Sequence, residues 1–166
     1  MRVVDGLTMQ GHVMKRFTTT VSIRSAPETI WAILTDGSGY ADWNPEIVRV
    51  EGSIRLGHKI RAHVALNGSR VQPVTVRVTE LEPVRRMVWT GGLPLGLFTG
   101  LRTFSLEPRA AGLVDFTLEV RFTGLLSSLI ARSLGDRQPD IDALARGLKK
   151  WAERPSVSDE GSGLTA

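Results

Sequence analysis

Hydrophobic and polar residues alternate along much of the chain between residues 16 and 124. The clearest example is residues 114–123, where Val114, Phe116, Leu118 and Val120 alternate with polar or charged residues. This period of two is typical of an antiparallel strand with one buried and one exposed face. Shorter runs of the same kind predict strands near residues 16–24, 47–51, 59–66, 74–79, 87–90 and 102–106. Between two of them, Asn67-Gly68 predicts a hairpin turn.

Helical spacing of apolar residues replaces the alternation after the first predicted strand. Ile30, Ile33 and Leu34 form a short stripe that ends at the glycine-rich turn 36–39. Ser25 followed by Glu28 predicts a capping box, with a proline in the first turn of the helix. A second short helical segment is expected near residues 40–45.

A longer helical stripe follows Gly124. Its members are Leu126, Leu129, Ile130, Leu134, Ile141, Leu144, Ala145, Leu148 and Trp151. Gly135 and Pro139 interrupt this stripe, and a proline inside a helix costs about 3 kcal/mol. We therefore expect a kink or break near residues 135–139, with Pro139 in the first turn of the second piece.

The order of these elements predicts an α+β helix-grip fold. In this fold a curved antiparallel sheet of about six to seven strands wraps around a long C-terminal helix, with two short helices after the first strand. The apolar face of such a sheet needs a cover, and only the terminal helix is large enough. A helix contacts a curved sheet along a line, so we expect an apolar cavity beside that line.

We predict a single domain over residues 15–154. Residues 1–14 are expected to be a loose leader, and the Ser/Gly-rich residues 155–166 a disordered tail. The chain has 166 residues, of which 42% are hydrophobic, which is enough for one core.

Composition narrows the chemistry. Cysteine is absent and there are three histidines, so we expect no disulfide, no thiol nucleophile, no metal site and no cofactor. No apolar run is long enough to span a membrane and no secretory signal is evident, so we expect a cytoplasmic protein without membrane insertion. The net charge is +4, but the arginines are scattered and form no stripe, which argues against nucleic acid binding.

The candidate ligand-binding residues are those expected to face the helix or the mouth of the cavity. They are Tyr40, Trp43, Val64, Val76, Met87, Trp89, Phe98, Arg102, Phe104, Phe116, Leu118, Leu126, Leu129 and Ile130. For most of these apolar residues plain core packing is the simpler interpretation. Tyr40 and Trp43 lie beside a glycine-rich turn, and Phe98 lies in the loop 91–100, which has the composition of a lid.

Arg102 is the polar residue of most interest, because it shares strand parity with Phe104 and Leu106. A buried charge is costly unless it is paired. Arg102 could orient a carboxylate or carbonyl of a ligand, or it could pair with an acid or lie in solvent. For acid–base chemistry the sequence offers little besides Arg102, Thr90, Tyr40 and His63, and His63 is expected to face outward.

Several motifs in order resemble the polyketide cyclase/START-like superfamily (SRPBCC, which includes birch-pollen-allergen-like proteins). They comprise Ala26-Pro27-Glu28-Thr29-Ile30-Trp31, Leu34-Thr35-Asp36, Tyr40 with Trp43-Asn44-Pro45, Val50-Glu51-Gly52, Pro83 with Met87 and Trp89, Phe104-Ser105-Leu106, Phe122-Thr123-Gly124, and Leu144 with Leu148-Lys149-Lys150. The resemblance covers about residues 15–154 and implies proteins that bind lipids, polyketides, sterols or hormones, some of which catalyse cyclisation or dehydration. Val120 stands where, in this resemblance, relatives often carry a glutamate, which counts against acid–base chemistry here.

The leading hypothesis is that the protein binds a hydrophobic or amphipathic small molecule, such as a lipid, sterol or polyketide, between sheet and helix. One alternative is a polyketide cyclase or dehydratase without metal or nucleotide cofactor. Another, implied by the resemblance alone, is a protein-interaction module like the chaperone activators of the same superfamily. A homodimer formed through an edge strand is possible under all three hypotheses.

Overall fold

The computed structural model describes residues 13–65 and 70–155. Its elements in chain order are β1 (Val13–Arg24), α1 (Pro27–Thr35), η1 (Gly37–Gly39), α2 (Tyr40–Trp43), β2 (Ile47–Glu51), β3 (Lys59–Ala65), β4 (Val71–Glu82), β5 (Arg86–Leu93), η2 (Pro94–Gly96), β6 (Phe98–Pro108), η3 (Ala110–Gly112), β7 (Leu113–Thr123), α3 (Ser127–Leu134) and α4 (Gln138–Ala152).

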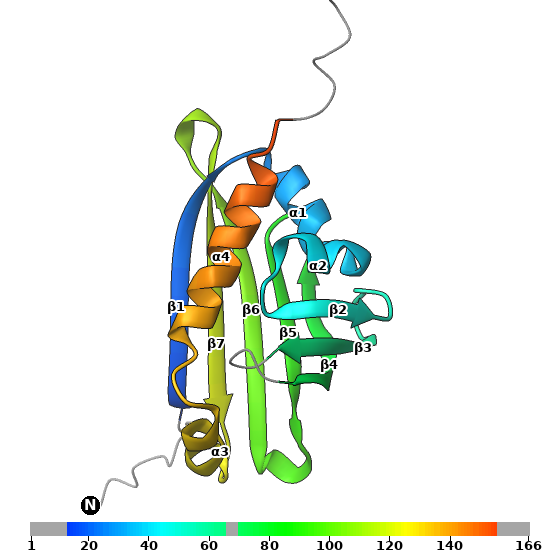
Figure 1. The fold of residues 1–166 in the computed structure, drawn as a ribbon, viewed down its shortest axis with the longest axis vertical. Helices are drawn as coiled ribbons and strands as arrows, with labels where there is room; N and C mark the ends of the chain where they lie inside the picture. Colours follow the sequence, from blue (N-terminus) through cyan, green and yellow to red (C-terminus); the bar gives the residue numbers. More distant parts are fainter. Residues whose placement is uncertain (1–12, 66–69, 156–166) are drawn as a thin grey trace, which may run out of the picture.

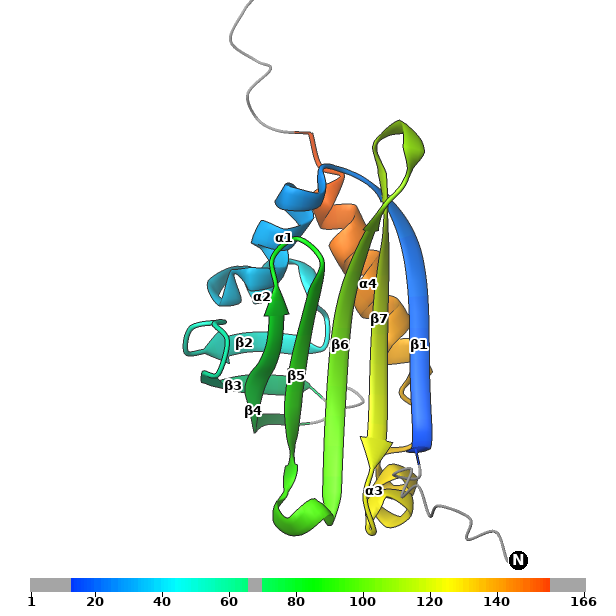
Figure 2. The ribbon, with the colours of Figure 1, turned by 180° about the vertical axis from the view of Figure 1, so that it is seen from behind.

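The strands form one antiparallel seven-stranded sheet in the order β1-β7-β6-β5-β4-β3-β2. The sheet curves around α4, which lies against β1 and β7, while α1 and α2 lie beside the C-terminal end of α4 (Figures 1 and 2). This arrangement confirms the predicted α+β helix-grip fold, including the short helices after the first strand. No helix in the described part of the chain has both the length and the apolar character needed to cross a bilayer.

The alternation along the strands corresponds to burial as expected. On β7, Val114, Phe116, Leu118 and Val120 are buried and face the helix, while their neighbours are half-buried. The first strand is longer than the sequence predicted, because β1 begins at Val13 and pairs with β7 from Thr123 onward. The rest of the predicted leader, almost all of the predicted tail and the Asn67-Gly68 turn lie outside the described residues.

The start of α1 differs from the prediction. Its N-cap is Ala26, which makes no side-chain cap hydrogen bond, and Pro27 occupies the first turn. Ser25 therefore lies one residue too early to cap the helix, and the predicted capping box is wrong. Proline replaces it as the start signal, because its fixed φ suits the first helical turn and its missing N–H loses no hydrogen bond there.

The predicted break in the C-terminal helical stripe is confirmed. The helix α3 ends at Leu134, Gly135 adopts a φ of 68°, and α4 begins at Gln138 with Pro139 in its first turn. The break corrects one expectation: Leu126 and Leu129 do not face inward, since they are 37% and 66% exposed. They belong to the α3 end of the stripe, and α3 is a separate short helix that does not continue the axis of α4.

The helix α4 supplies the main cover of the sheet. Its buried residues Ile141, Leu144, Ala145 and Leu148 recur at the spacing of one helical face. Side chains at its two ends also fix it to β1. Gln138 Nε2 donates to the Thr18 carbonyl at 3.0 Å, and Lys149 Nζ donates to the Ser22 carbonyl at 2.6 Å.

A glycine in the middle of α4 allows close contact with α2. A Cβ built on Gly147 would lie 2.2 Å from the carbonyl oxygen of Trp43. No side chain larger than hydrogen fits at that distance. The crossing of α4 over the end of α2 therefore depends on this position.

Gly147→Ala should destabilise the protein. In an ordinary helix this change stabilises by about 1 kcal/mol, because alanine is the better helix former. Here the added methyl must push α4 away from Trp43, and overpacking of this kind costs about 1–3 kcal/mol. Urea unfolding followed by circular dichroism measures the difference. Arg146→Ala, on the exposed side of the same helix, is the matched control and should change stability by less than about 0.5 kcal/mol. A Gly147→Ala protein as stable as the parent would contradict the contact.

Candidate functional site

A cavity of about 620 Å³ lies between the concave face of the sheet and the region where α3 passes into α4. This finding confirms the cavity predicted beside the line of helix–sheet contact. Its lining residues are Glu46, Ile47, Ala62, Val64, Pro73, Val74, Thr75, Val76, Trp89, Gly91, Gly92, Leu93, Phe98, Gly100, Leu101, Arg102, Val120, Phe122, Ile130, Leu134, Arg137 and Ile141. Most of them are apolar, as in pockets that bind small molecules.

Glycines in the wall leave this space unfilled. Gly91 of β5 and Gly100 of β6 lie opposite each other in the sheet, and both line the cavity together with Gly92. Farther along the same strands, large side chains fill the space beneath the sheet. There Met87 and Phe104 are fully buried and lie outside the cavity lining. The sheet–helix interior is therefore solid along one half and hollow along the other.

Three charged residues from distant parts of the chain meet at the cavity wall. Arg102 Nη2 on β6 lies 2.9 Å from Glu46 Oε1, and the Nη2 of Arg137 donates to the same oxygen. Arg137, just before α4, also reaches Asp140, with 2.8 Å between Nη1 and Oδ2. Glu46 and Arg137 are 3% and 5% exposed. We call these three residues, together with Asp140, the ion cluster.

The backbone around Glu46 holds its carboxylate in place. The buried Asn44 side chain accepts hydrogen bonds from the backbone N–H of Glu46 at 2.9 Å and of Ile47 at 2.8 Å. The Glu46 carbonyl in turn accepts from the N–H of Ala65 at 2.8 Å. This turn directs the Glu46 side chain beneath the sheet instead of into solvent.

Burial and charge act in opposite directions on the groups of the ion cluster. Burial by itself raises the pKa of Glu46, but the nearby guanidinium groups of Arg102 and Arg137 outweigh it and hold that pKa below its ordinary value. Burial likewise lowers the pKa of Arg102, and the Glu46 carboxylate more than offsets this and raises it. At neutral pH the pair is therefore fully ionised.

Some polar atoms on the cavity-lining residues have no hydrogen-bond partner. Glu46 Oε2, Arg102 Nη1 and Trp89 Nε1 are buried, and none of them is hydrogen-bonded within the described part of the chain. Leaving one such group unsatisfied costs about 1–3 kcal/mol. One acceptor and two donors on residues that line one cavity are therefore free to hydrogen-bond a polar group or water that enters it.

The structure divides the sequence-predicted ligand-binding residues into several groups. Those that line the cavity are Val64, Val76, Trp89, Phe98, Arg102 and Ile130. Those in the solid part of the core are Tyr40, Met87, Phe104, Phe116 and Leu118. Leu126 and Leu129 are exposed, and Trp43 lines a separate surface groove. Strand parity identifies the face of the sheet, but it does not identify the position along the strand at which the hollow begins.

Tyr40 lies deep in the core and not at a cavity mouth. Its hydroxyl donates to the Leu34 carbonyl at 2.7 Å, and burial raises its pKa far above the ordinary value. The tyrosine ring stacks on Trp89 with 5.8 Å between centroids. Tyr40 is thus one step removed from the cavity, behind a residue that lines it.

Two cavity residues carry charges that sequence reasoning missed. Glu46 follows Trp43-Asn44-Pro45, a segment interpreted only as a turn, and Arg137 lies in the predicted helix break. The available signal was Arg102: an inward arginine requires a buried acid. The sequence did not show which of the many acids would meet it. Arg102 combines two of the predicted roles, since it pairs with an acid and also lines the cavity.

The other residues considered for acid–base chemistry lie outside the cavity lining. His63 Nε2 is 3.1 Å from Glu51 Oε1, and Thr90 Oγ1 is 2.7 Å from Thr79 Oγ1. Within the described residues the ionisable groups that line the cavity are those of Glu46, Arg102 and Arg137. Val120 also lines it, so the position where the resemblance suggests a glutamate offers an apolar surface.

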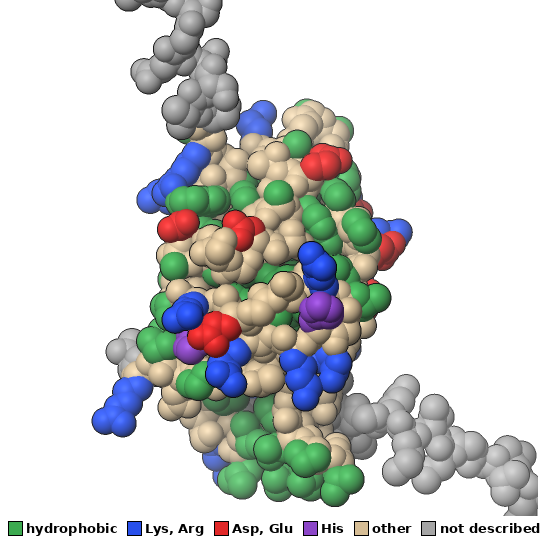
Figure 3. Space-filling model, turned by 90° about the vertical axis from the view of Figure 1, so that its right-hand side faces the viewer, with side chains coloured by type: hydrophobic (Ala, Val, Ile, Leu, Met, Phe, Trp, Pro, Cys, Tyr) green, Lys and Arg blue, Asp and Glu red, His purple; other side chains and the backbone are tan. Residues whose placement is uncertain are grey.

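The cavity extends toward the end of the molecule where the β5–β6 turn meets α3. There the backbone N–H of Leu126 donates a hydrogen bond to the Leu97 carbonyl at 2.7 Å. Leu95 of this turn is 94% exposed and Leu125, just before α3, is 83% exposed. Figure 3 shows hydrophobic side chains gathered at this end of the molecule. Leu93, half-exposed on the same turn, lines the cavity itself. An apolar molecule entering at this end would meet an apolar surface.

Glu46→Gln should lower the stability of the fold at neutral pH. It should also make that stability less dependent on pH. The pKa of Glu46 is lower in the folded protein than its ordinary value of 4.5. Its ionised form therefore stabilises the fold above about pH 4.5, and this stabilisation is lost as the pH falls through the folded pKa. Removing the charge leaves the buried Arg102 and Arg137 without their shared carboxylate partner. We expect this to lower the free energy of unfolding by about 3 kcal/mol at pH 7.

Urea unfolding of both proteins between pH 7 and pH 3 measures this effect. The difference between them should shrink as the solution is acidified. Glu28→Gln, at an exposed position, is the control and should differ from the parent by a constant, small amount. A Glu46→Gln difference that does not change with pH would show that Glu46 is not ionised in the folded protein.

Comparison with known proteins agrees with this architecture. The family model described as "Polyketide cyclase / dehydrase and lipid transport" matches residues 14–153. A comparison with curated proteins finds no match.

Similar solved structures include a START superfamily protein from Mycobacterium smegmatis, with 18% identity and a TM-score of 0.64 over 83% of this chain and 97% of that one. The Zhui aromatase/cyclase from Streptomyces sp. R1128 has 19% identity and a TM-score of 0.67 over 84% of this chain and 94% of that one. Truncated norcoclaurine synthase from Thalictrum flavum has 13% identity and a TM-score of 0.64, covering 86% and 95% of the two chains. At these identities the structures share the fold. Since the family model matches most of the chain, the protein belongs to the polyketide cyclase/dehydrase and lipid transport family.

Proposed function

We propose that the protein binds a small amphipathic molecule in the cavity between the sheet and the α3–α4 break. The observation that carries this proposal is the ion cluster, which places unpartnered polar atoms on the wall of an otherwise apolar cavity. The apolar body of the ligand would lie against Val64, Val76, Phe98 and Ile130. Its polar group would meet Glu46 and Arg102.

The charge balance of the ion cluster favours a ligand with a neutral polar group. The acids Glu46 and Asp140 face the arginines Arg102 and Arg137, so the ion pairs already neutralise each other. An anionic ligand would bring an uncompensated charge into a desolvated site, which is costly. An alcohol or phenol hydroxyl can instead accept from Arg102 Nη1 and donate to Glu46 Oε2, and a carbonyl can accept from Arg102 Nη1, in each case without adding charge.

The family agrees with this ligand class. Its description includes both polyketide chemistry and lipid transport, and one similar solved structure is an aromatase/cyclase. Binding is the better-supported function of this cavity. The pKa of Glu46 is held low by two guanidinium groups, which makes it a weak proton acceptor. A cyclase or dehydratase would need a stronger base at that position.

Calorimetric titration with three related probes tests the proposal: naphthol, naphthoate and naphthalene. Naphthol should bind most tightly, since it carries both an apolar body and a neutral group that donates and accepts. Val64→Phe should abolish binding by filling the cavity, because Val64 lines it. Val48→Phe, on the exposed face of β2, is the matched control and should bind as the parent does. Binding that survives Val64→Phe unchanged, or the absence of naphthol binding, would sink the proposal.

The paired variant Arg102→Met/Glu46→Gln tests the role of the ion cluster. Removing both charges together avoids leaving one of them buried without its partner. We expect naphthol affinity to fall by about 10- to 150-fold, since one hydrogen bond to a charged group contributes about 1.5–3 kcal/mol. Naphthalene affinity should stay within about twofold of the parent. Equal losses for both probes would show that the ion cluster shapes the cavity without contacting the ligand.

A further inference from the structure

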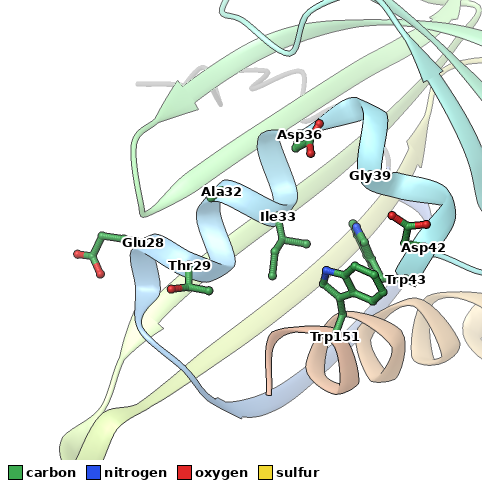
Figure 4. A pocket seen from close by; sticks show the side chains of 9 residues that line it. All are labelled: Glu28, Thr29, Ala32, Ile33, Asp36, Gly39, Asp42, Trp43 and Trp151. Atoms are coloured by element: carbon green, nitrogen blue, oxygen red, sulfur yellow. The ribbon is translucent and has the colours of Figure 1, made fainter. Parts of the chain in front are cut away.

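A second hollow lies on the opposite side of α2, between α1, η1 and the end of α4 (Figure 4). It has a volume of about 550 Å³, within the range of sites that bind small molecules. The residues that line this groove are Glu28, Thr29, Ala32, Ile33, Asp36, Gly39, Asp42, Trp43 and Trp151. The sheet–helix cavity shares none of these residues, so the two are separate sites. We call it the α1–α4 groove.

The ionisable side chains that line this groove are all acidic. Glu28, Asp36 and Asp42 line it, and none of the three forms an ion pair within the described residues. Most other acids in that part of the chain do form one. The whole chain has a net charge of +4, so an unneutralised acidic groove is a local exception. A cation from outside the chain would satisfy it.

The conformation of Asp36 keeps it ionised beside the groove. Its Oδ1 accepts hydrogen bonds from the backbone N–H of Ser38 at 3.0 Å and from the Ser38 hydroxyl. These bonds lower the pKa of Asp36 despite the opposing effect of burial. The local turn thus fixes a negative charge at one end of the groove, and Asp42 follows on α2.

The floor of the groove is aromatic. In Figure 4, Trp43 and Trp151 lie next to each other, with Ile33 facing them from α1. Tryptophan is the side chain that attracts cations most strongly through its ring face. This chain already shows the interaction, because the guanidinium carbon of Arg154 lies 3.8 Å from the ring centroid of Trp151.

Trp43 also provides a polar atom that has no partner. Its side chain is nearly fully buried, with 5% of the residue exposed, and Nε1 makes no hydrogen bond within the described chain. Figure 4 shows this nitrogen on the edge of the ring toward the end of α1 and Asp36. A ligand that brings a hydrogen-bond acceptor, besides its cationic group, would complete the indole N–H.

We propose that the α1–α4 groove binds a small organic cation: an amine or quaternary ammonium compound with an apolar or aromatic body and a hydrogen-bond acceptor. The body lies on Trp43, Trp151 and Ile33. The cationic group lies near the carboxylates of Asp36, Asp42 and Glu28. The proposal is independent of the ligand of the sheet–helix cavity.

Titration with para-methoxybenzylammonium, followed by the indole N–H resonances in ¹⁵N-labelled protein, tests this proposal. The indole signals assigned to Trp43 and Trp151 should shift, and that of Trp89, in the other cavity, should not. The neutral counterpart para-methoxybenzyl alcohol should bind at least tenfold more weakly. Raising the salt concentration should weaken binding of the cation, because exposed charges are screened.

Carboxylate variants identify the source of the attraction. Asp42→Asn and Glu28→Gln should each weaken binding of the cation about two- to fivefold, the usual range for one exposed charge pair. Asp136→Asn, just before the N-terminal end of α4 and away from the groove, is the control and should leave binding unchanged. Equal affinity for the amine and the alcohol, shifts at Trp89, or no effect of the carboxylate variants would overturn the proposal. So would binding of a lysine-rich peptide without binding of the small cation.

Discussion

The contact between Glu46 and the two arginines is the interaction on which the cavity depends. It joins the turn before β2, the middle of β6 and the segment before α4, which are far apart in the sequence. Each partner alone would be a buried charge, so the three segments must come together or pay a large desolvation penalty. The contact therefore ties the start of α4 to the sheet and to the turn before β2, beside the cavity.

What keeps the interior open is a difference in side-chain size along the same strands. On β5 and β6, Met87 and Phe104 fill the space under the sheet, and Gly91 and Gly100 follow toward the other end. The break at Gly135 acts in the same direction, because α3 turns away from the axis of α4 and does not extend the solid core. Glycines in the sheet and a glycine between the two helices thus both contribute to the hollow.

The fold could be predicted from the sequence because it depends on periodicity. The alternation on β7 and the helical spacing from Ile141 to Leu148 each identify a buried face directly, and Pro139 marks the helix break. The site depends on information of another kind. Met87 and Val76 both lie on the concave face of the sheet, yet Met87 packs in the solid core and Val76 lines the cavity. The pairing of Arg102 with Glu46 joins residues whose sequence separation carries no pattern, so the arginine was predictable and its partner was not.

The charged groups are buried and paired in one hollow and exposed to water in the other. This difference allows one small domain to hold both. In the sheet–helix cavity the ion cluster is desolvated, so its acids and bases must balance and the space left over suits a neutral polar group. In the α1–α4 groove the carboxylates belong to exposed residues, so water stabilises them and no internal base is required. The two sites have no lining residue in common. A ligand in one site therefore meets neither the charges nor the aromatic surface of the other.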